Sequence, residues 1–434
     1  MFIKDNTMPT RLFSPVVLLH AGLCIALCTG LCIAEPDPGS VLTTLNNSLK
    51  SVREFGVLPT NTAAVNKDNL QKAIDWAHRR GAAIYVEPTE DPYPVAGGII
   101  LRANVSLIGV HGPVGRGTRH PEKVQPVGSV FAIEDEKNVF ITVENSTQIR
   151  GIQFWYPKQT VKNPEKIIEY PATIQVSPTK GAQGVTLSGL TFYGEFLAMD
   201  FNAKPNRVVE QILFEHCYGY PLSGEFIRID YCYDIPRILH CHVNPANRRF
   251  IEGGYSRAVI DSVVARKTFT YRIDHTDNAQ CIDLFTFGSY GGIYLGPATY
   301  GQLTNFNFDC VTVGIHKLGD NSFNRNWQIS QGSIIANIAA DQQEIHPLII
   351  EGRGHTSLIS VESFSGHNGA LTTLGKSQDY LLVKGDEKLT ITMFGCRMRD
   401  YVSDKPITLL NPKAVIRAIG CIDKHENVFE YSTK

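Results

Sequence analysis

The chain has 434 residues and a formal net charge of -1, from 41 basic and 42 acidic side chains. With so little net charge there is no bulk field to recruit nucleic acid or an anionic membrane, so these two classes of partner are set aside. Hydrophobic residues make up 43% of the chain, including 21 Phe and 17 Tyr, which is enough for a continuous core and excludes a disordered protein.

The N-terminal segment has the composition of a secretory signal. Lys4 and Arg11 precede an uncharged apolar stretch that ends at Ala34, before an acidic, proline-rich flank. We predict a signal peptide over residues 1–34, followed by a polar leader over residues 35–51, and therefore an exported protein that is periplasmic or secreted. The apolar stretch is also long enough to span a bilayer, so an uncleaved N-terminal anchor is the alternative.

Residues 52–110 differ from the rest of the chain because they carry a helical pattern. Apolar side chains recur at helical spacing over residues 69–77, with Asp68 or Asn66 as the N-cap and Gly81 as the stop. Two strand-like segments follow, over residues 83–86 and 105–108. A helix at the open end of a solenoid protects its edge strands, so we interpret this region as an N-terminal cap with the first rungs.

A repeated hexad dominates residues 111–434, which we interpret as the body of the protein. Its six positions are an apolar residue, any residue, a small or polar residue, an apolar residue, any residue and an apolar residue. Most consecutive copies are separated by roughly 21 to 38 residues, the length of a solenoid turn. They begin at Ile149, Leu187, Phe214, Ile238, Ile260, Phe308, Ile329, Met393 and Ala418. Short strands with a fixed turn residue predict an all-β fold, a single-stranded parallel β-helix.

The cysteines are predicted to be reduced. Three of the ten lie in the predicted signal peptide, which leaves seven, an odd number. Four of the seven take the fourth position of the hexad: Cys217, Cys241, Cys396 and Cys421. A shared inward position favours buried thiols that pack as small hydrophobic side chains over a framework of disulfides.

Several short segments near the N-terminus match a known superfamily. They are Arg53-Glu54-Phe55-Gly56, the helix from Leu70 to Ala77, Gly81 to Pro88, Tyr93-Pro94-Val95 and Asn104 to Gly109. These segments resemble the opening of pectate lyase superfamily proteins of the rhamnogalacturonase and epimerase-like type. The resemblance implies a right-handed parallel β-helix and activity on a polysaccharide. The motifs that mark polygalacturonase-type hydrolases are missing from the sequence, so no catalytic residue is carried over.

A column of acids emerges when the second strand of each turn is aligned on its apolar residues. An acid then takes one register on four successive turns, in Met199-Asp200-Phe201, Ile229-Asp230-Tyr231, Ile251-Glu252-Gly253 and Ile273-Asp274-His275. Because side chains alternate along a strand, the apolar neighbours are expected to face inward and the acids outward. Arg228 and Arg272 lie two residues before two of these acids and should face the same way.

Carboxylates on neighbouring turns would have the spacing that glycoside hydrolysis needs. Strands lie about 4.8 Å apart, so neighbouring acids would be roughly 5 Å apart and second neighbours roughly 10 Å. The first distance suits a retaining glycosidase, and the second is near the upper end of the inverting range. Like charges this close raise at least one pKa, as a general acid requires. We predict Asp230, Glu252 and Asp274 as the catalytic acid, base or nucleophile.

Residues around the column are predicted to bind the substrate. Arg228 and Arg272 are suited to a uronate or sulfate group, or to keeping one carboxylate charged. The rest of the predicted substrate-binding set is Asp200, Tyr231, Tyr233, Asp234 and His275. No His or Cys spacing matches a zinc site, so we predict no metal or cofactor apart from Ca²⁺ in one alternative.

The sequence thus predicts an exported polysaccharide-active enzyme, a glycoside hydrolase rather than a lyase, whose partner is an acidic or complex glycan. Two alternatives remain open. In one, the acids bind Ca²⁺ and the protein is a polysaccharide lyase with an Arg or Lys base. In the other, the acids and arginines are surface ion pairs on a noncatalytic carbohydrate-binding or cell-surface β-helix.

Overall fold

The computed structural model describes residues 48–110, 118–177, 179–205, 208–319, 326–340, 343–365 and 374–433. The predicted signal peptide or anchor lies outside these residues, as does most of the predicted polar leader. Within the described ranges, no helix is long and apolar enough to cross a membrane.

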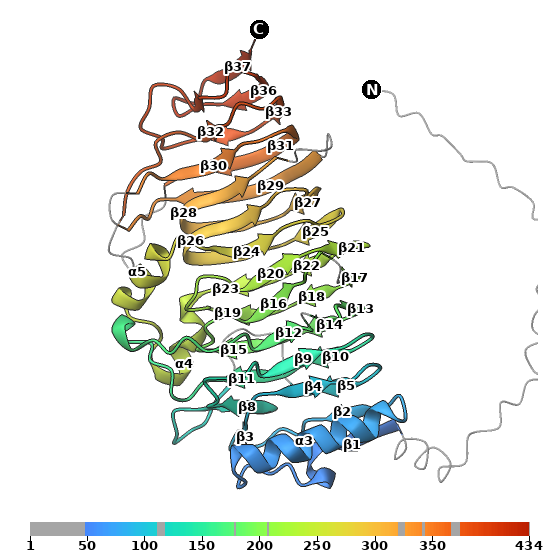
Figure 1. Ribbon diagram of the computed structural model, residues 1–434. Helices are drawn as coiled ribbons and strands as arrows, with labels where there is room; N and C mark the ends of the chain where they lie inside the picture. Colours follow the sequence, from blue (N-terminus) through green and yellow to red (C-terminus); the bar gives the residue numbers. More distant parts are fainter. Residues whose placement is uncertain are drawn as a thin grey trace, which may run out of the picture. The chain divides into compact units, whose positions relative to one another are not determined.

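From Ser48 onward the chain winds as a coil of short parallel strands (Figure 1). Each strand pairs with the equivalent strand one turn earlier and one turn later, so the predicted parallel β-helix is confirmed. Antiparallel pairing among the named strands joins β36 (Ala414–Ile422) to β37 (Val428–Ser432) and β6 (Thr118–Arg119) to β7 (Pro126–Val127).

The strands form three faces. The first face contains β1 (Leu49–Ser51), β2 (Ala83–Tyr85), β5 (Ser106–Ile108), β10 (Gln148–Arg150), β14 (Thr186–Ser188), β18 (Leu213–Glu215), β22 (Arg237–Leu239), β25 (Ala279–Ile282), β27 (Gly301–Thr304), the first parts of β29 (Asn326–Ala336) and β31 (Gly354–Ser363), β33 (Leu389–Phe394) and β36. The second face contains β3 (Tyr93–Val95), β8 (Val130–Ile133), β11 (Gln153–Trp155), β15 (Thr191–Tyr193), β19 (Tyr218–Gly219), β23 (His242–Val243), the first parts of β26 (Phe285–Leu295) and β28 (Asn307–Lys317), the second parts of β29 and β31, and β34 (Arg397–Met398).

The third face carries the candidate site. It contains β4 (Ile99–Leu101), β9 (Ile141–Val143), β12 (Ile174–Val176), β16 (Met199–Asn202), β20 (Ile227–Asp230), β24 (Phe269–Ile273), the second parts of β26 and β28, β30 (His346–Ile350), β32 (Leu381–Val383) and β35 (Ile407–Leu409). A small separate sheet is formed by β13 (Ala182–Gln183), β17 (Val209–Glu210) and β21 (Cys232–Tyr233).

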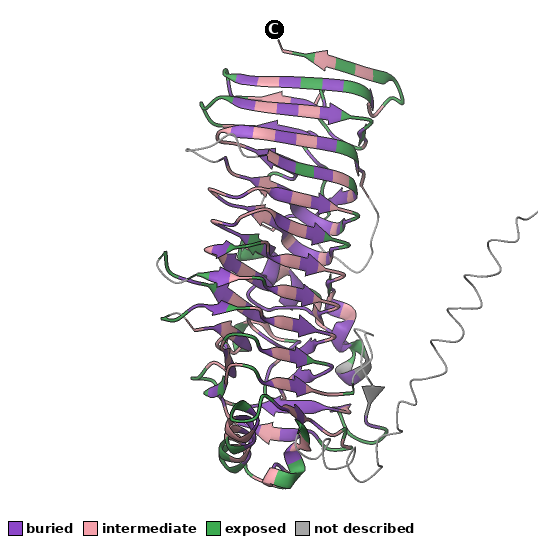
Figure 2. Cartoon of the chain, turned by 90° about the vertical axis from the view of Figure 1, so that its right-hand side faces the viewer, coloured by how far each residue is buried: buried purple, intermediate pink, exposed green. Residues whose placement is uncertain are grey.

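Buried and more exposed side chains alternate along the strands (Figure 2). On β20, for example, Ile227 and Ile229 are buried while Arg228 and Asp230 are partly exposed. Alternation follows from the two-residue period of a strand, and in a coil it sends one set of side chains to the core and the other outward. The outward set on each face is therefore free to carry chemistry.

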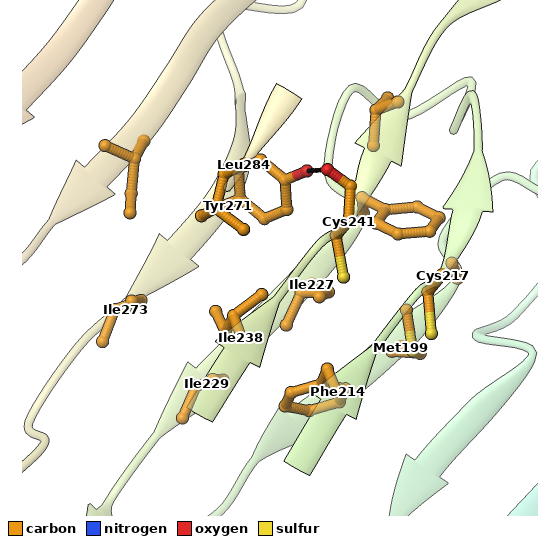
Figure 3. Close-up of a cluster of buried hydrophobic side chains, with 14 of the residues drawn as sticks. Met199, Phe214, Cys217, Ile227, Ile229, Ile238, Cys241, Tyr271, Ile273 and Leu284 are labelled. Atoms are coloured by element: carbon orange, nitrogen blue, oxygen red, sulfur yellow. Dashed lines mark hydrogen bonds between the residues drawn. The ribbon is translucent and has the colours of Figure 1, made fainter. Parts of the chain in front are cut away.

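The core inside the coil is a stack of apolar side chains from successive turns (Figure 3). Cys217 and Cys241 lie in this stack, and all seven cysteines of the described residues are buried and free, which confirms that they pack as reduced thiols. Tyr271 is also fully buried, and its hydroxyl hydrogen-bonds to the carbonyl oxygens of Cys241 and Phe285 at 3.1 and 3.0 Å. Its polar group is thus satisfied inside the core.

From β10 onward, each turn passes from the first face to the second through a residue with positive φ. This explains the small or polar third position of the hexad, because glycine, asparagine and similar residues adopt the left-handed conformation most readily. The series consists of Gly151, Gly189, His216, His240, Asp283, Asn305, Gln331, Ser360, Gly395 and Gly420, with φ from 50° to 68°.

Two predicted copies of the hexad are wrong. The copy at Ile260 lies in α5 (Arg257–Ala265), a helix whose N-cap Ser256 accepts a hydrogen bond from the backbone of Val259. Apolar residues three apart satisfy a helix as well as the hexad, which is why the pattern was ambiguous. The copy at Phe308 lies within β28, and the turn residues of these rungs are instead Asp283 and Asn305.

The predicted N-terminal helix is present, but it is longer than predicted. It is α3 (Ala63–His78), which follows η1 (Val52–Phe55) and packs against β2, β3 and β4 at the first turns of the coil (Figure 1). Its N-cap is Thr62 rather than Asn66. Asn66 is fully buried and donates to the carbonyls of Leu58 and Pro94, so it ties the helix to the coil instead of capping it.

Long connections between the second and third faces hold the remaining helices. They are η2 (Pro164–Lys166), η3 (Pro245–Arg248), α4 (Arg249–Glu252) and α5. The last three form one excursion between β23 and β24. The register on the third face continues across it, because β20 pairs directly with β24.

We expect Gly189→Val to lower the free energy of unfolding by about 1–2 kcal/mol, because a β-branched residue is strained at the φ of 63° that this turn requires. Gly189→Asn is the matched control and should cost less, since asparagine tolerates this conformation. A Cβ here meets nothing closer than 3.7 Å, so crowding does not confound the comparison. Equal losses for the two variants in urea unfolding would contradict the turn assignment.

Candidate functional site

The outward positions of the third face form two columns that run from turn to turn. On β16, β20, β24, β26 and β28 the first column consists of Asp200, Arg228, Arg272, Tyr294 and His316. The second column lies two residues further along each strand. In it, Asp230 and Asp274 share one register on adjacent turns, because Ile229 pairs with Ile273.

The predicted column of four acids needs two corrections. Glu252 is the last residue of α4, within the excursion, so it is not on a strand of the third face. Glu252 follows Asp230 by 22 residues, which is about the length of one turn, so the sequence suggested that it lies on the next turn. The acid on the next turn is Asp274. Asp200 belongs to the first column, since it pairs with Arg228, and Asn202 pairs with Asp230. The alignment had placed Asp200 two residues out of register.

Three carboxylates and two arginines lie close together on and beside the two columns, and we call them the carboxylate–arginine cluster: Asp200, Glu225, Arg228, Arg272 and Asp274. Arg228 lies 3.5 Å from Asp200 and 3.6 Å from Glu225. Arg272 donates from Nε to Oδ2 of Asp274 at 2.7 Å. Each arginine thus pairs with at least one acid, and the two arginines are themselves neighbours on adjacent turns.

Burial raises the pKa of three acids in this region. For Asp200, burial is the main cause and the charge of Arg228 opposes it. For Glu225, burial raises the pKa, Arg228 and Arg272 oppose it, and the nearby carboxylates of Asp200 and Asp274 raise it further. Carboxyls that retain protons above their ordinary range are suited to proton donation.

Asp230 stands beside a stacked pair of rings. Burial raises its pKa, the hydrogen bond with His275 lowers it, and the charge of Asp274 raises it again. Its Oδ1 lies 2.9 Å from Nδ1 of His275 and accepts a hydrogen bond from the backbone of Tyr231. The rings of Tyr231 and His275 are stacked with centroids 4.6 Å apart. The structure therefore brings these two predicted residues to Asp230.

Tyr233 and Asp234, two other predicted binding residues, are placed differently. Tyr233 belongs to β21 in the small separate sheet, and Asp234 follows it. Asp234 accepts a hydrogen bond from Gln211 at 2.5 Å, and its φ of 51° marks a turn. Neither residue is on the third face, because the chain leaves that face after Asp230.

Gly296 makes room for Asp274. It takes the next position in the second column after Asp274, and a Cβ there would overlap Oδ1 of Asp274 and lie 2.8 Å from its Cγ. The carboxyl group of Asp274, a residue that is 7% exposed, therefore rests against the bare backbone of the following turn. A glycine at this position sets where the carboxylate lies.

The sequence analysis missed the continuation of the first column. The guanidinium of Arg272 lies 5.1 Å from the ring centroid of Tyr294, and Tyr294 meets His316 edge-on at 5.4 Å. Nε2 of His316 lies 2.6 Å from Glu351, and this hydrogen bond lowers the pKa of Glu351. Extending the alignment of Arg228 and Arg272 to the next strands would have found Tyr294 and His316 in the first column. The sequence analysis followed the acids of the second column instead, and these end at Gly296.

Glu225 was missed for a different reason. It precedes β20 in a connection, so no strand pattern includes it. Its relation to Asp200 and Asp274 depends on how that connection folds back onto the face.

The described residues contain no group of three or more His, Cys, Asp or Glu side chains that could hold a metal ion.

Comparisons of the chain with known proteins found similar solved structures but no family. No family model matches it, and neither does any curated protein. It is similar to DFA-IIIase from Arthrobacter chlorophenolicus A6, without its lid and in complex with GF2, with a TM-score of 0.48 and 10% identity over 88% of this chain and 97% of that chain. It is also similar to tailspike protein 3 of bacteriophage CBA120, with a TM-score of 0.46 and 12% identity over 96% of this chain and 69% of that one.

A third similar structure is the tailspike protein of Acinetobacter baumannii phage AM24, with a TM-score of 0.42 and 10% identity over 88% of this chain and 55% of that one. At these identities, the assignment to the class of parallel β-helix proteins rests on the strands and register of this chain itself.

We expect Glu225→Gln to raise the thermal midpoint at neutral pH and to change it little near pH 4. A raised pKa in the folded state means that Glu225 contributes stability at low pH and loses it as the pH rises through that pKa. Glutamine has no such loss, so the gain should grow with pH. The control is Glu426→Gln, at an exposed glutamate paired with Arg397. A gain that is equal at every pH would show that charge burial is not its cause.

Proposed function

We propose that this protein is an exported glycoside hydrolase that cleaves an acidic or complex polysaccharide on the third face of its β-helix. The observation that carries the proposal is the common register of Asp230 and Asp274 on adjacent turns. Strands lie about 4.8 Å apart, and retaining glycosidases place their two carboxyls about 5 to 5.5 Å apart. The N-terminal segments that resemble the pectate lyase superfamily support the same class of substrate.

The surroundings of the two acids suggest different roles. Asp230 has a raised pKa and is our candidate general acid, which donates a proton to the glycosidic oxygen as its bond to the anomeric carbon breaks. Asp274 accepts a hydrogen bond from Arg272, and its carboxylate is our candidate nucleophile, which forms a bond to that carbon. Water then attacks the same carbon and gives a proton to Asp230, and the bond to Asp274 breaks.

The neighbouring residues would hold the substrate. Arg228 and Arg272 present guanidinium groups, which suit a uronate or sulfate group on the glycan. The stacked rings of Tyr231 and His275 lie beside the carboxyl group of Asp230, where a sugar ring could pack against them. The predicted signal peptide supports export. Export suits an enzyme that acts on polysaccharides, because such large substrates do not enter cells.

A second function is noncatalytic binding of a glycan. It is favoured by the pairing of each acid with a basic group: Asp200 with Arg228, Asp274 with Arg272 and Asp230 with His275. Partly exposed ion pairs of this kind decorate a surface at little gain in stability. Binding to a polysaccharide without release of reducing ends would select this function.

We expect Asp230→Asn and Asp274→Asn each to lower kcat by at least a hundredfold on a polysaccharide that the wild type degrades, because each removes an acid or a nucleophile from the reaction. The measurement is the release of reducing ends from a panel of plant and algal polysaccharides. Absorbance of the products, recorded in parallel, would detect the unsaturated uronate that a lyase forms.

Asp283→Asn is the matched control for these variants. Asp283 also contacts a histidine, His240 at 2.9 Å, but it lies in the turn between the first and second faces. It should retain full activity. Unchanged kcat in Asp230→Asn or Asp274→Asn would refute the catalytic pair.

Gly296→Ala should lower kcat while leaving the fold intact, because the added methyl group would displace the carboxyl of Asp274. Its effect can be assigned by a double-mutant cycle with Asp274→Asn. If Gly296 acts through Asp274, the double variant is no less active than Asp274→Asn alone. Additive losses would mean that the methyl group acts on something else.

A further inference from the structure

The corner between the first and second faces holds a pocket of about 300 Å³, which we call the glycine-turn pocket. It lies over three successive turns of the coil, those of β10, β14 and β18 (Figure 1). Its volume is at the lower end of the range that small-ligand sites occupy. The residues that line it include Arg150, Gly151, Ser188, Gly189, Glu215 and His216.

The pocket exists because two turns carry no side chain at this corner. The residue with positive φ is Gly151 on the turn of β10 and Gly189 on the turn of β14. His216 and His240 take the same position on the next two turns. A Cβ at Gly189 would meet nothing closer than 3.7 Å, so the space beside it is open. The two glycines therefore form a floor of bare backbone, and the imidazole of His216 stands at one end of it.

One face of the His216 ring is directed into the pocket. The rings of His216 and His240 are stacked, with centroids 4.8 Å apart and planes at 22°. Because His240 lies on the turn that follows His216, the opposite face of the His216 ring is directed toward the preceding turn, at Gly189. Glycine has no side chain to cover that face. The row of stacked rings thus ends at the pocket, where a ring of the ligand can continue it.

Three outward side chains of the first face supply the polar groups. Arg150, Ser188 and Glu215 share one register on adjacent turns. Among the described residues, the guanidinium of Arg150 has no ion-pair or hydrogen-bond partner. Oε2 of Glu215 accepts a hydrogen bond from Ser188 at 3.2 Å, and Oε1 lies 3.8 Å from Nδ1 of His216, beyond hydrogen-bond distance. The pocket therefore offers donors from Arg150 and an acceptor oxygen from Glu215.

The opposite charges of Arg150 and Glu215 favour a neutral ligand. Strands of neighbouring turns lie about 4.8 Å apart, so the backbones at these two residues are roughly 10 Å apart. An anionic ligand is attracted by Arg150 but repelled by Glu215, and a cationic ligand is in the reverse position. A neutral ligand with several hydroxyl groups can hydrogen-bond to both charged groups, and such hydrogen bonds are stronger than those between neutral partners.

We propose that the glycine-turn pocket binds a neutral sugar residue, whose ring stacks on His216 and whose hydroxyl groups accept from Arg150 and donate to Glu215. The proposal rests on the proposed function in one respect, that the ligand is a glycan. The corner between the first and second faces is opposite the third face, which carries the proposed catalytic pair. A sugar in this pocket thus belongs to a different part of the polysaccharide from the residue that is cleaved. The pocket holds the protein on its substrate and takes no part in cleavage.

Gly189→Asn tests the pocket, because asparagine tolerates the left-handed conformation and its side chain fills the floor. Binding of neutral hexamers of galactose, xylose and mannose is measured by calorimetry with the full-length Asp274→Asn variant as the parent. We expect at least one of these hexamers to bind, and added Gly189→Asn to weaken its affinity at least tenfold. Added Arg150→Ala should do the same, since a hydrogen bond to a charged group contributes about that much.

Gly420→Asn is the matched control. Gly420 has a φ of 60° at the same corner, and a Cβ there meets nothing within 4 Å, but it lies on β36 at the far end of the coil. This variant should bind as the parent does. An equal loss in the control, unchanged affinity in Gly189→Asn, or no binding of any neutral hexamer would overturn the proposal.

A hexamer of galacturonic acid tests the preference for a neutral sugar. It should lose no affinity when Gly189→Asn is added, and a loss as large as that of the neutral hexamers would contradict the charge argument. A wild type that hydrolyses no polysaccharide would refute the proposed function and leave these binding results standing.

Discussion

The parallel register between successive turns is the constraint on which the rest of the structure depends. Because Ile229 pairs with Ile273, and Arg228 with Arg272, residues 44 positions apart become neighbours on one face. A slip of one residue would turn every outward side chain of a strand into the core, so apolar burial fixes the register strongly. The residue with positive φ between the first and second faces starts each turn at the same point. The site is therefore a consequence of how the core stacks.

The excursion between β23 and β24 shows how tolerant this arrangement is. It inserts η3, α4 and α5 into one turn, yet β20 and β24 pair as though it were absent. Loop insertions at one point of a solenoid turn do not disturb the contacts between neighbouring turns, on which stability depends. Because a turn with an insertion is longer than its neighbours, the number of residues between two positions does not show whether they are equivalent on successive turns. Glu252 was assigned to a strand for this reason.

The sequence predicted the fold better than the site, and the difference has a physical cause. Inward residues obey a pattern that hydrophobic burial imposes, so the hexads at Ile149, Leu187, Phe214 and Ile238 and the buried cysteines could be recognised from residue types. Outward residues obey no such pattern, and their neighbours are known only when the register is known. Asp230 and Asp274 were aligned correctly, because an isoleucine of the core precedes each. Asp200 was misaligned by two residues, because Met199 and Phe201 are both buried and either one fits the apolar position of the alignment. Glu225 lies in a connection, where no periodic pattern applies.

A coil of this kind separates the source of stability from the place of chemistry. The core is apolar and continuous from turn to turn, so it can hold outward side chains in arrangements that are unfavourable in themselves. Asp200, Glu225 and Asp230 are partly buried and near other acids, and their raised pKa values measure what that costs the folded state. The acids gather on the turns from β16 to β24, and the same column continues through Tyr294 and His316 on β26 and β28. Because the register aligns the outward side chains of successive turns, a coil can offer a continuous site that is longer than any single turn.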